Sequence, residues 1–426
     1  MLKEIRMENW KSYQQSTLYL DPLTVLIGTN ASGKSNALDA FQFLSRSVAG
    51  LPINTILQGD NIHPGLRGGK EWACRDGSDR FALEAVVGTD DVNTEFVYRL
   101  EVAVAGIPQI YAESLKRTRY RPRAGTVSSE INLFTTDVCP DTAPAITARL
   151  YNTKTGKPRP SGRQTTILSQ LYPEAQAQSL RAEIGEGVIA VNRALSKIFI
   201  LDPIPSHMRG YTALSADLDS DAANIAGVIA ALVDEQKAKV EATLTDYVSQ
   251  LPERDIRRIY ADTVGRFNSD AMLYCDEQWG NESLSVDARG MSDGTLRFLA
   301  ILVALLVRPK NSLLIVEEID NGLHPSRAKL LLDVLKTIGK ERAIDILVTT
   351  HNPALLDNLG PEMTPFITIS HREDASGSSH LTLLEDIAML PKLLSAGPVG
   401  TLASQGRLEA ALKQEVMKRE SGGAFQ

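Results

Sequence analysis

Cysteine is scarce in this chain, and long apolar runs are missing. The three cysteines among 426 residues, Cys74, Cys139 and Cys275, are odd in number and far apart, without the spacing of metal ligands. We therefore predict reduced thiols in a cytoplasmic protein. Apolar stretches fall short of the roughly 18 residues that a membrane span needs, and residues 1–6 lack a secretory apolar segment. We expect no membrane span.

An excess of positive charge is also missing, because the net charge is −7. This balance argues against a surface that binds nucleic acid all over the protein, but not against a local basic patch. Two clusters qualify, and their cations are Lys116, Arg117, Arg119, Arg121 and Arg123 in the first and Lys154, Lys157, Arg159 and Arg163 in the second. Contact with nucleic-acid phosphates is one interpretation. A solvated strand edge is the other, and we favour it.

Sustained heptads and internal repeats are absent as well. A long coiled-coil arm needs an apolar pattern that persists over many turns, so no such arm is expected. The chain is 43% hydrophobic, which is enough for a sizeable core and for two or three lobes. These features predict a compact head rather than a rod.

The most informative feature present is the run Gly28-Thr29-Asn30-Ala31-Ser32-Gly33-Lys34-Ser35. An apolar segment predicted as a buried strand precedes it, and a helical pattern follows. That context is typical of a phosphate-binding loop, whose backbone N–H groups surround phosphate oxygens at a helix N-terminus. Lys34 would reach the β- and γ-phosphates of ATP, and the Ser35 hydroxyl would hold Mg²⁺. The expected nucleotide-binding residues are Gly28, Asn30, Ser32, Gly33, Lys34, Ser35 and Asn36. A plain strand–turn–helix corner is the alternative, but it needs no lysine there.

A second motif lies about 280 residues later, where the apolar residues 313–316 precede Glu317 and Glu318. This pattern predicts a buried strand with carboxylates at its C-terminal tip, the edge at which open α/β sheets bind ligands. Glu317 would hold the Mg²⁺ shell, and Glu318 would polarise the attacking water. A strand that simply ends in solvated acids is the alternative.

Two further pieces flank this acidic strand. Upstream, Ser292 is placed to cap an apolar helix, and Gly294 would allow backbone to approach an anion at its start. Downstream, the apolar residues 346–348 lead through two threonines to His351 at the tip of another predicted strand. A lone histidine at a strand end is usually structural, but its place after the acidic strand favours a role in sensing the γ-phosphate.

The order of these motifs resembles the ABC-type ATPase head, in the RecF and structural-maintenance-of-chromosomes branch rather than among the transporters. Within that branch, the phosphate loop and a later run, from Glu317 to Pro325, look like the motifs of stand-alone AAA-family ATPases of bacterial anti-phage operons. They are also similar to the head of overcoming-lysogenisation-defect nucleases. The residues of the later run are Glu317, Glu318, Asn321, Gly322, Leu323, His324 and Pro325. The opening residues 2–13 resemble the first strand of that branch, whereas the middle of the chain matches poorly.

The resemblance implies an α/β fold, a P-loop NTPase ABC-type head with a mixed sheet and an inserted helical lobe. It assigns residues 1–105 and 284–390 to a split ATPase lobe, 106–283 to an inserted strand and helical lobe, and 391–426 to a C-terminal helix and tail. It also implies an ATP-hydrolysing enzyme with ATP and Mg²⁺ as cofactors. Two copies would dimerise with ATP between them, the Ser292 and Gly294 motif of one covering the nucleotide on the other.

Some positions depart from the family pattern. Glu317 stands where Asp is usual, and Ile319 where proline is common. The glutamine that usually links the site to the helical lobe has no clear position, and Gln58 is a candidate. Only about 75 residues follow His351, so we expect no fused nuclease domain.

The function expected from this resemblance is that of the sensor or motor subunit of an anti-phage defence complex with a separate effector such as a nuclease. A RecF-like DNA-binding ATPase of recombination and repair is the alternative, with nucleic acid bound through Lys116–Arg123. A third possibility is a regulatory scaffold with a slow ATP site, which rests on Glu317 alone.

Overall fold

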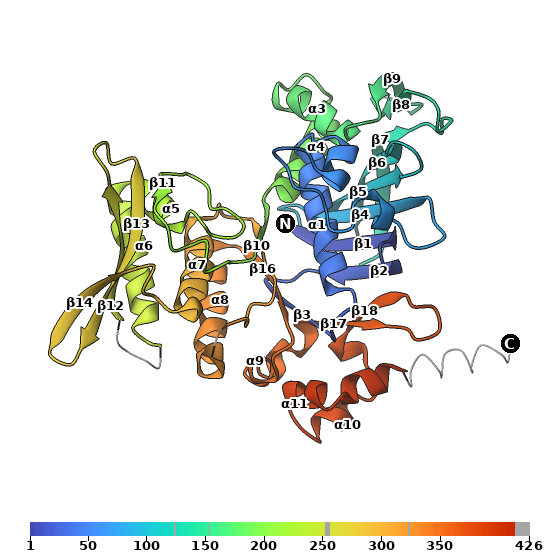
Figure 1. Ribbon diagram of the computed structural model, residues 1–426. Helices are drawn as coiled ribbons and strands as arrows, with labels where there is room; N and C mark the ends of the chain where they lie inside the picture. Colours follow the sequence, from blue (N-terminus) through green and yellow to red (C-terminus); the bar gives the residue numbers. More distant parts are fainter. Residues whose placement is uncertain (123–124, 153, 252–255, 323, 414–426) are drawn as a thin grey trace. The chain divides into compact units, whose positions relative to one another are not determined.

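The computed structural model describes residues 1–122, 125–152, 154–251, 256–322 and 324–413, and it confirms the predicted α/β fold. The chain divides into two compact units (Figure 1). Unit 1 comprises residues 1–21, 28–198 and 368–382, and unit 2 comprises residues 22–27, 199–367 and 383–426. The sequence-based division into an ATPase lobe and an inserted lobe stays a prediction.

Unit 1 is built on a mixed sheet with the strand order β17-β18-β2-β1-β4-β5-β6-β7-β8-β9. Neighbours from β2 through β1 and β4 to β9 pair antiparallel, whereas β18 meets β2 in parallel at Ser379 and Tyr13. The mixed sheet is therefore confirmed. The strands are β1 (Leu2–Trp10), β2 (Tyr13–Tyr19), β4 (Arg80–Gly88), β5 (Thr94–Ala103), β6 (Gln109–Tyr120), β7 (Val127–Thr136), β8 (Ala145–Leu150), β9 (Lys157–Gly162), β17 (Ile367–Arg372) and β18 (Ser379–Leu383).

The sequence pattern predicts an irregular segment at residues 124–165, and this expectation is wrong. The segment forms β7, β8 and β9, which pair in register as a meander. Much of β7 and β9 is exposed, so the strands lack the apolar alternation by which strands are recognised. Two prolines, Pro158 and Pro160, lie in β9, which is tolerated because β9 is the last strand of the sheet.

Helices of unit 1 pack beside these strands (Figure 1). Helix α1 (Lys34–Val48) contacts α4 (Ala182–Ser196), which contacts α3 (Ile167–Gln176) and strands β4 to β7. The remaining short elements are α2 (Ile53–Gln58) and η1 (Lys70–Trp72). Under α1, the rings of Trp10, Phe43 and Phe81 form a cluster with centroids 4.7 to 5.6 Å apart. Each such pair contributes about 0.5–1.5 kcal/mol beyond its burial, so the cluster fixes α1 on the sheet.

Unit 2 contains a parallel sheet of three buried strands. Strand β15 (Leu313–Val316) pairs with β16 (Asp345–Thr350), which pairs with β3 (Leu23–Ile27), and β10 (Ile198–Leu201) lies next to β15. Helix α7 (Asp293–Val307) is buried nearly all round, which explains why its sequence is apolar throughout from Phe298 onward. It packs against α8 (Ala328–Arg342) and β15. The other elements are η2 (Pro325–Arg327), α9 (Pro353–Asp357), η3 (Pro361–Phe366), η4 (Leu384–Asp386), α10 (Leu390–Leu394) and α11 (Val399–Ser404).

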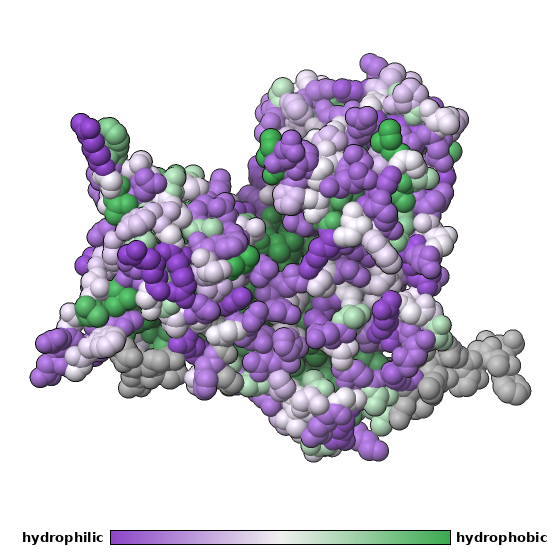
Figure 2. All heavy atoms as spheres, in the orientation of Figure 1, coloured by the Kyte–Doolittle hydropathy of each residue, from purple (hydrophilic) through white to green (hydrophobic). Residues whose placement is uncertain are grey.

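A second, small sheet in unit 2 contains β12 (Ile256–Val264), β13 (Asp270–Trp279), β14 (Glu282–Asp287) and β11 (Thr212–Ala213). Helices α5 (Ile225–Ala231) and α6 (Asp234–Val248) contact β12. Thr245 and Glu241 of α6 accept hydrogen bonds from β12 N–H groups, each 3.0 Å long, so α6 covers that edge. Hydrophobic residues on the visible face of this region are isolated spots among hydrophilic ones (Figure 2).

Several smaller predictions can be compared with the structure. The sequence patterns of residues 180–199 and 224–251 predict two helical stretches, and these are confirmed as α4 and as the pair α5 and α6. All three cysteines are free thiols. Among the described residues, no helix is long and apolar enough to cross a membrane. The helix expected at residues 407–418 is present at 407–413, and its remainder lies outside the described residues, as do residues 420–423.

Candidate nucleotide site

The phosphate loop occupies the link between β3 and α1, as predicted. Within it, the Ser32 N–H donates to the Thr29 carbonyl at 3.2 Å and closes a turn. Gly28 and Gly33 have φ of 151° and 116°, in the region that favours glycine. A Cβ at Gly28 would lie 2.2 Å from the Ser370 carbonyl oxygen, and one at Gly33 would lie 2.6 Å from the Ser379 Oγ. Both glycines are therefore required by the loop's shape.

The start of α1 fits an anionic ligand. In the part of the chain that the structure describes, this helix N-terminus has no side-chain cap and no acidic residue in its first turn. Its N–H groups and dipole therefore suit phosphate oxygens. The Lys34 Nζ donates to the Gly28 and Thr29 carbonyls at 2.7 and 3.0 Å, so its charge is held over the loop. The Ser32 Oγ is buried without a hydrogen-bond partner among the described residues. The loop fits the phosphates of ATP, with Ser35 as the expected Mg²⁺ ligand.

The turn between β1 and β2 holds this loop in place through hydrogen bonds, a role that was not predicted from the sequence. The Trp10 Nε1 donates to the Asn36 carbonyl at 2.7 Å, and the Tyr13 hydroxyl donates to the Gly33 carbonyl at 3.0 Å. The Asn36 amide donates to the Ser12 Oγ at 2.8 Å. Burial raises the pKa of the Tyr13 phenol, which keeps it a donor. The match of residues 2–13 to the family's first strand was the available signal.

A buried ion cluster fixes the first turns of α1. Asp39 is 2% exposed and accepts hydrogen bonds from the Lys11 ammonium and from the Arg67 guanidinium at 2.9 and 3.0 Å. Arg67 also donates to the Ser35 carbonyl at 3.1 Å. Burial lowers the pKa of Lys11, although the Asp39 carboxylate opposes this effect. Removing one partner of such a buried group typically costs about 3–5 kcal/mol, so the cluster is a structural support of the loop helix.

In unit 2, the predicted acids and histidine lie at the same edge of the parallel sheet. Glu317 and Glu318 follow β15, His351 follows β16, and Val316 is in register with Val348. Strand β3 is parallel to β16, with Ile27 opposite Thr350. Ile27 is bonded to Gly28 of the phosphate loop, and Thr350 to His351. Glu318 has φ of 47°, a left-handed conformation that is uncommon for a non-glycine residue.

Ser292 and Gly294 lie at the start of α7. The Ser292 Oγ accepts a hydrogen bond from the Thr295 N–H at 3.1 Å, which confirms the predicted cap. A Cβ at Gly294 would lie 2.7 Å from the Gly322 carbonyl oxygen and 2.9 Å from an Arg327 nitrogen. Close packing against residue 322 thus requires a glycine at position 294, independently of the predicted approach to an anion.

Arg209 clamps the same loop and was also missed by sequence reasoning. Its Nη1 donates to the carbonyls of Ala288, Arg289 and Met291 at 2.8 to 2.9 Å. Its Nη2 contacts the Asp293 carboxylate. The contacts span about 80 residues of sequence, so no local pattern reveals them. Arg209 therefore fixes the backbone that leads into the Ser292 cap.

Some cations of the basic clusters pair with acids. Lys116 pairs with Glu130, Arg117 with Glu183, and Arg159 with Glu174 through two hydrogen bonds. Arg163 is 1% exposed and donates to the carbonyls of residues 110, 140 and 143, so its inclusion in a surface patch is wrong. Arg123 lies outside the described residues. These pairings support the interpretation as a structural strand edge, and nucleic-acid contact stays a prediction.

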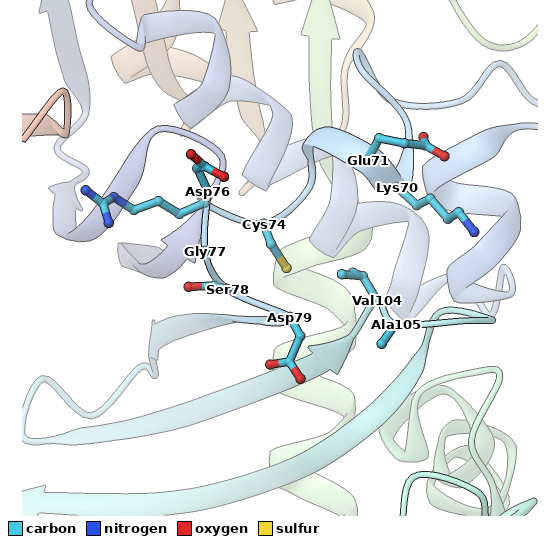
Figure 3. Close-up of a pocket in the computed structure, with 10 residues that line it drawn as sticks. Lys70, Glu71, Cys74, Asp76, Gly77, Ser78, Asp79, Val104 and Ala105 are labelled. Atoms are coloured by element: carbon cyan, nitrogen blue, oxygen red, sulfur yellow. The ribbon is translucent and has the colours of Figure 1, made fainter.

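Unit 1 also contains a pocket of about 260 Å³ beside Cys74 (Figure 3). Lys70 and Glu71 of η1 line it together with Asp76, Ser78 and Asp79 of the following loop. Burial, with Asp79 nearby, raises the pKa of the Cys74 thiol to about 12. The thiol therefore stays protonated and is a poor nucleophile. The lining charges are mixed in sign and define no ligand.

The phosphate loop and the parallel sheet indicate a P-loop ATPase, and comparisons with known proteins agree with this class. Residues 1–80 match a family described as an AAA ATPase domain. Residues 189–357 match a family of AAA domains whose description suggests an AbiEii toxin of a type IV toxin–antitoxin system. A search among curated proteins finds no match.

Among solved structures, the chain is similar to an Smc head bound to the C-terminal winged-helix domain of ScpA. The TM-score is 0.50 at 14% identity, over 89% of this chain and 96% of that one. An SMC head domain from Thermotoga maritima gives a TM-score of 0.42 at 14% identity, over 90% and 98%. The second score is below 0.5, so the first alone bears on the fold. The fold is that of an ABC-type P-loop ATPase head.

Proposed function

We propose that the chain binds and hydrolyses ATP, with Mg²⁺, as an ABC-type head. The observation that carries this proposal is the parallel arrangement of β3, β15 and β16, whose C-terminal ends lead to the phosphate loop, to two carboxylates and to a histidine. Parallel α/β sheets bind their ligands at this edge. The uncapped start of α1 and the matches to AAA families support the same proposal.

Each proposed site residue has a distinct task. The loop N–H groups from Gly28 to Asn36 and the Lys34 ammonium would bind the phosphates, and Ser35 and Glu317 would hold the Mg²⁺. That ion would neutralise charge on the β- and γ-phosphates when bound. Glu318 would orient the attacking water and accept its proton, and His351 would contact the γ-phosphate. Glu317 is longer than the usual Asp by one methylene, so its contact with Mg²⁺, direct or through a water, would differ in geometry from that of an Asp.

Two copies of the chain would share each nucleotide. In this proposal Ser292 and Gly294 of one copy cover the ATP held by the phosphate loop of the other, at the start of α7. ATP then joins the copies, and hydrolysis by Glu318 separates them. The burial of α7 and the hydrogen bonds from Arg209 to the backbone before Ser292 support the proposal that the start of α7 is held rigidly.

The wider role that we propose is the sensor or motor of a defence complex with a separate effector. The family matched by residues 189–357 is described by a toxin–antitoxin system, which has two components. The similar Smc head is also bound to a domain of another protein. The RecF-like alternative loses support because Lys116, Arg117 and Arg159 pair with acids. The buried Arg163 donates to backbone carbonyls instead.

The direct test compares three variants in ATP binding and turnover. Glu318→Gln should bind ATP normally but hydrolyse it about 10²- to 10⁴-fold more slowly, because the general base is lost while the shape is kept. Lys34→Ala should abolish binding, which makes it the control for the site itself. Unchanged turnover in Glu318→Gln, with Glu317→Gln inactive, would show that the two acids have exchanged roles. Wild-type affinity in Lys34→Ala would refute the site.

A further inference from the structure

The backbone around Glu318 is tied to one residue of the neighbouring strand. The Glu318 N–H donates to the Thr349 Oγ1 at 2.8 Å, and the Ile319 N–H donates to the Thr349 carbonyl at 3.0 Å. Thr349 lies in β16, one of the most buried strands of unit 2, and is itself 1% exposed. Two consecutive N–H groups of the acidic turn thus depend on the side chain and the backbone of the same threonine.

These bonds hold Glu318 in a conformation that it would not adopt alone. Its φ of 47° lies in the left-handed region, which costs about 1–2 kcal/mol for a residue with a Cβ. Such a conformation persists only when the surroundings over-determine it. Besides the bonds to Thr349, the Glu318 carbonyl accepts a hydrogen bond from the Asn321 N–H at 2.8 Å. The turn is therefore fixed from both ends.

The next residue anchors the far side of the turn. The Thr350 Oγ1 donates to the carboxylate of Asp320, which is 8% exposed, and it accepts a hydrogen bond from the Asn352 N–H at 3.1 Å. Asn352 caps α9 and directly follows His351. The end of β16 therefore determines the backbone on both sides of the proposed catalytic pair, Glu318 and His351.

We propose that the Thr349 hydroxyl is a positioning group for Glu318, which holds the carboxylate where it can take a proton from water. This inference rests on the proposed function of Glu318. Thr349 is too buried to meet nucleotide or water, so it acts only through the Glu318 backbone. Without the hydroxyl, the Glu318 N–H loses its acceptor and φ relaxes toward extended values, which turns the side chain away from its place.

Thr349→Val tests this proposal, because valine keeps the shape and the β-branched fit to the strand but removes the hydroxyl. We expect kcat for ATP to fall about 10- to 100-fold, in line with the cost of a misplaced catalytic group, while KM and the Kd for ATP stay within about twofold. Thr349→Ser keeps the hydroxyl and should retain most of the turnover. Melting curves report whether each variant folds, and Thr349→Ala replaces the valine variant if that one does not.

The outcomes separate this inference from the function on which it rests. If Thr349→Val hydrolyses ATP like the wild type while Glu318→Gln is inactive, the positioning role is refuted and the proposed function stands. If Thr349→Ser is as slow as Thr349→Val, packing of the methyl group rather than the hydroxyl is responsible, which also refutes it. If Glu318→Gln itself keeps full turnover, the proposed function fails.

Discussion

At the scale of single residues, buried polar groups form structural hydrogen bonds that cannot be recognised from the neighbouring sequence. Glu113 of β6 is 2% exposed, and its carboxylate accepts hydrogen bonds from the N–H groups of Ile167 and Leu168, at 2.6 and 2.8 Å. It also accepts one from the Tyr98 hydroxyl at 3.0 Å. These contacts bind the start of α3 to the sheet. Thr166, the cap of α3, and Asn192 of α4 donate to carbonyls at the end of α1.

Glu113 also gives unit 1 a specific pH dependence. Burial raises the pKa of this carboxyl to about 7, although its hydrogen bonds oppose the shift. The folded state thus holds the proton more tightly than the unfolded state, whose pKa is near 4.5. The contribution of this group to stability is full below pH 4.5 and is lost as the pH rises through 7.

We predict that Glu113→Gln removes this dependence, because glutamine is neutral throughout. The unfolding free energy of the wild type relative to the variant should fall by about 3 kcal/mol between pH 4.5 and 7. Urea denaturation of both proteins at pH 5, 6, 7 and 8 measures the difference. Parallel pH profiles for the two proteins would show that Glu113 does not titrate in this range.

At the scale of elements, the sequence predicted the strands and helices whose determining residues lie close together in the chain. The strand at residues 23–27, the loop and the helix are continuous in sequence, and their glycines and apolar runs are all within a few residues of each other. The same holds for β15, β16 and α7. In these elements, burial on all sides produces apolar runs that are easy to recognise, at residues 25–27, 298–307, 313–316 and 346–348.

The elements and contacts that were missed depend on partners far away in the chain. Strands β7 and β9 are exposed on much of their surface, so pairing between strands rather than apolar alternation defines them. Arg209, Thr349 and Glu113 each act on residues at least 31 positions away. A single sequence shows which residue types are present but not which of these distant groups meet.

Arg209 tests whether the backbone before Ser292 must be held in place for two copies of the chain to associate. We predict that Arg209→Met weakens ATP-driven association of two copies about tenfold. The loop before Ser292 loses three hydrogen bonds from the guanidinium, and Asp293 loses a fourth. ATP binding to the phosphate loop of a single copy should not change. Sedimentation of Arg209→Met and of the control Arg258→Met, an arginine that stacks on Tyr260 at 4.5 Å, measures association. Equal behaviour of both variants would exclude a role of Arg209 in presenting the loop.

At the scale of the whole molecule, the account requires each active site to be composed from two copies of the chain. A composite site predicts that damage to its two halves can be separated. Ser292→Arg places a bulky cation where the other copy's nucleotide would be covered, whereas Lys34→Ala removes the nucleotide itself. Neither variant alone should associate on ATP or hydrolyse it.

A mixture of these two variants should regain part of the wild-type turnover, because a mixed dimer retains one intact site. The gain should depend on the ratio of the two proteins and be greatest near equal amounts. A steady-state ATPase assay across mixing ratios measures it. ATP-driven dimers formed by Ser292→Arg alone would argue against coverage by that motif.

The most direct measurement of the central claim is the molar mass of Glu318→Gln in solution, by light scattering, with and without ATP and Mg²⁺. This variant should bind the nucleotide without releasing it, so the closed state accumulates. The account predicts a monomer of 46.4 kDa without nucleotide and twice that mass with ATP, but not with ADP. A mass that stays at 46.4 kDa in saturating ATP would contradict it.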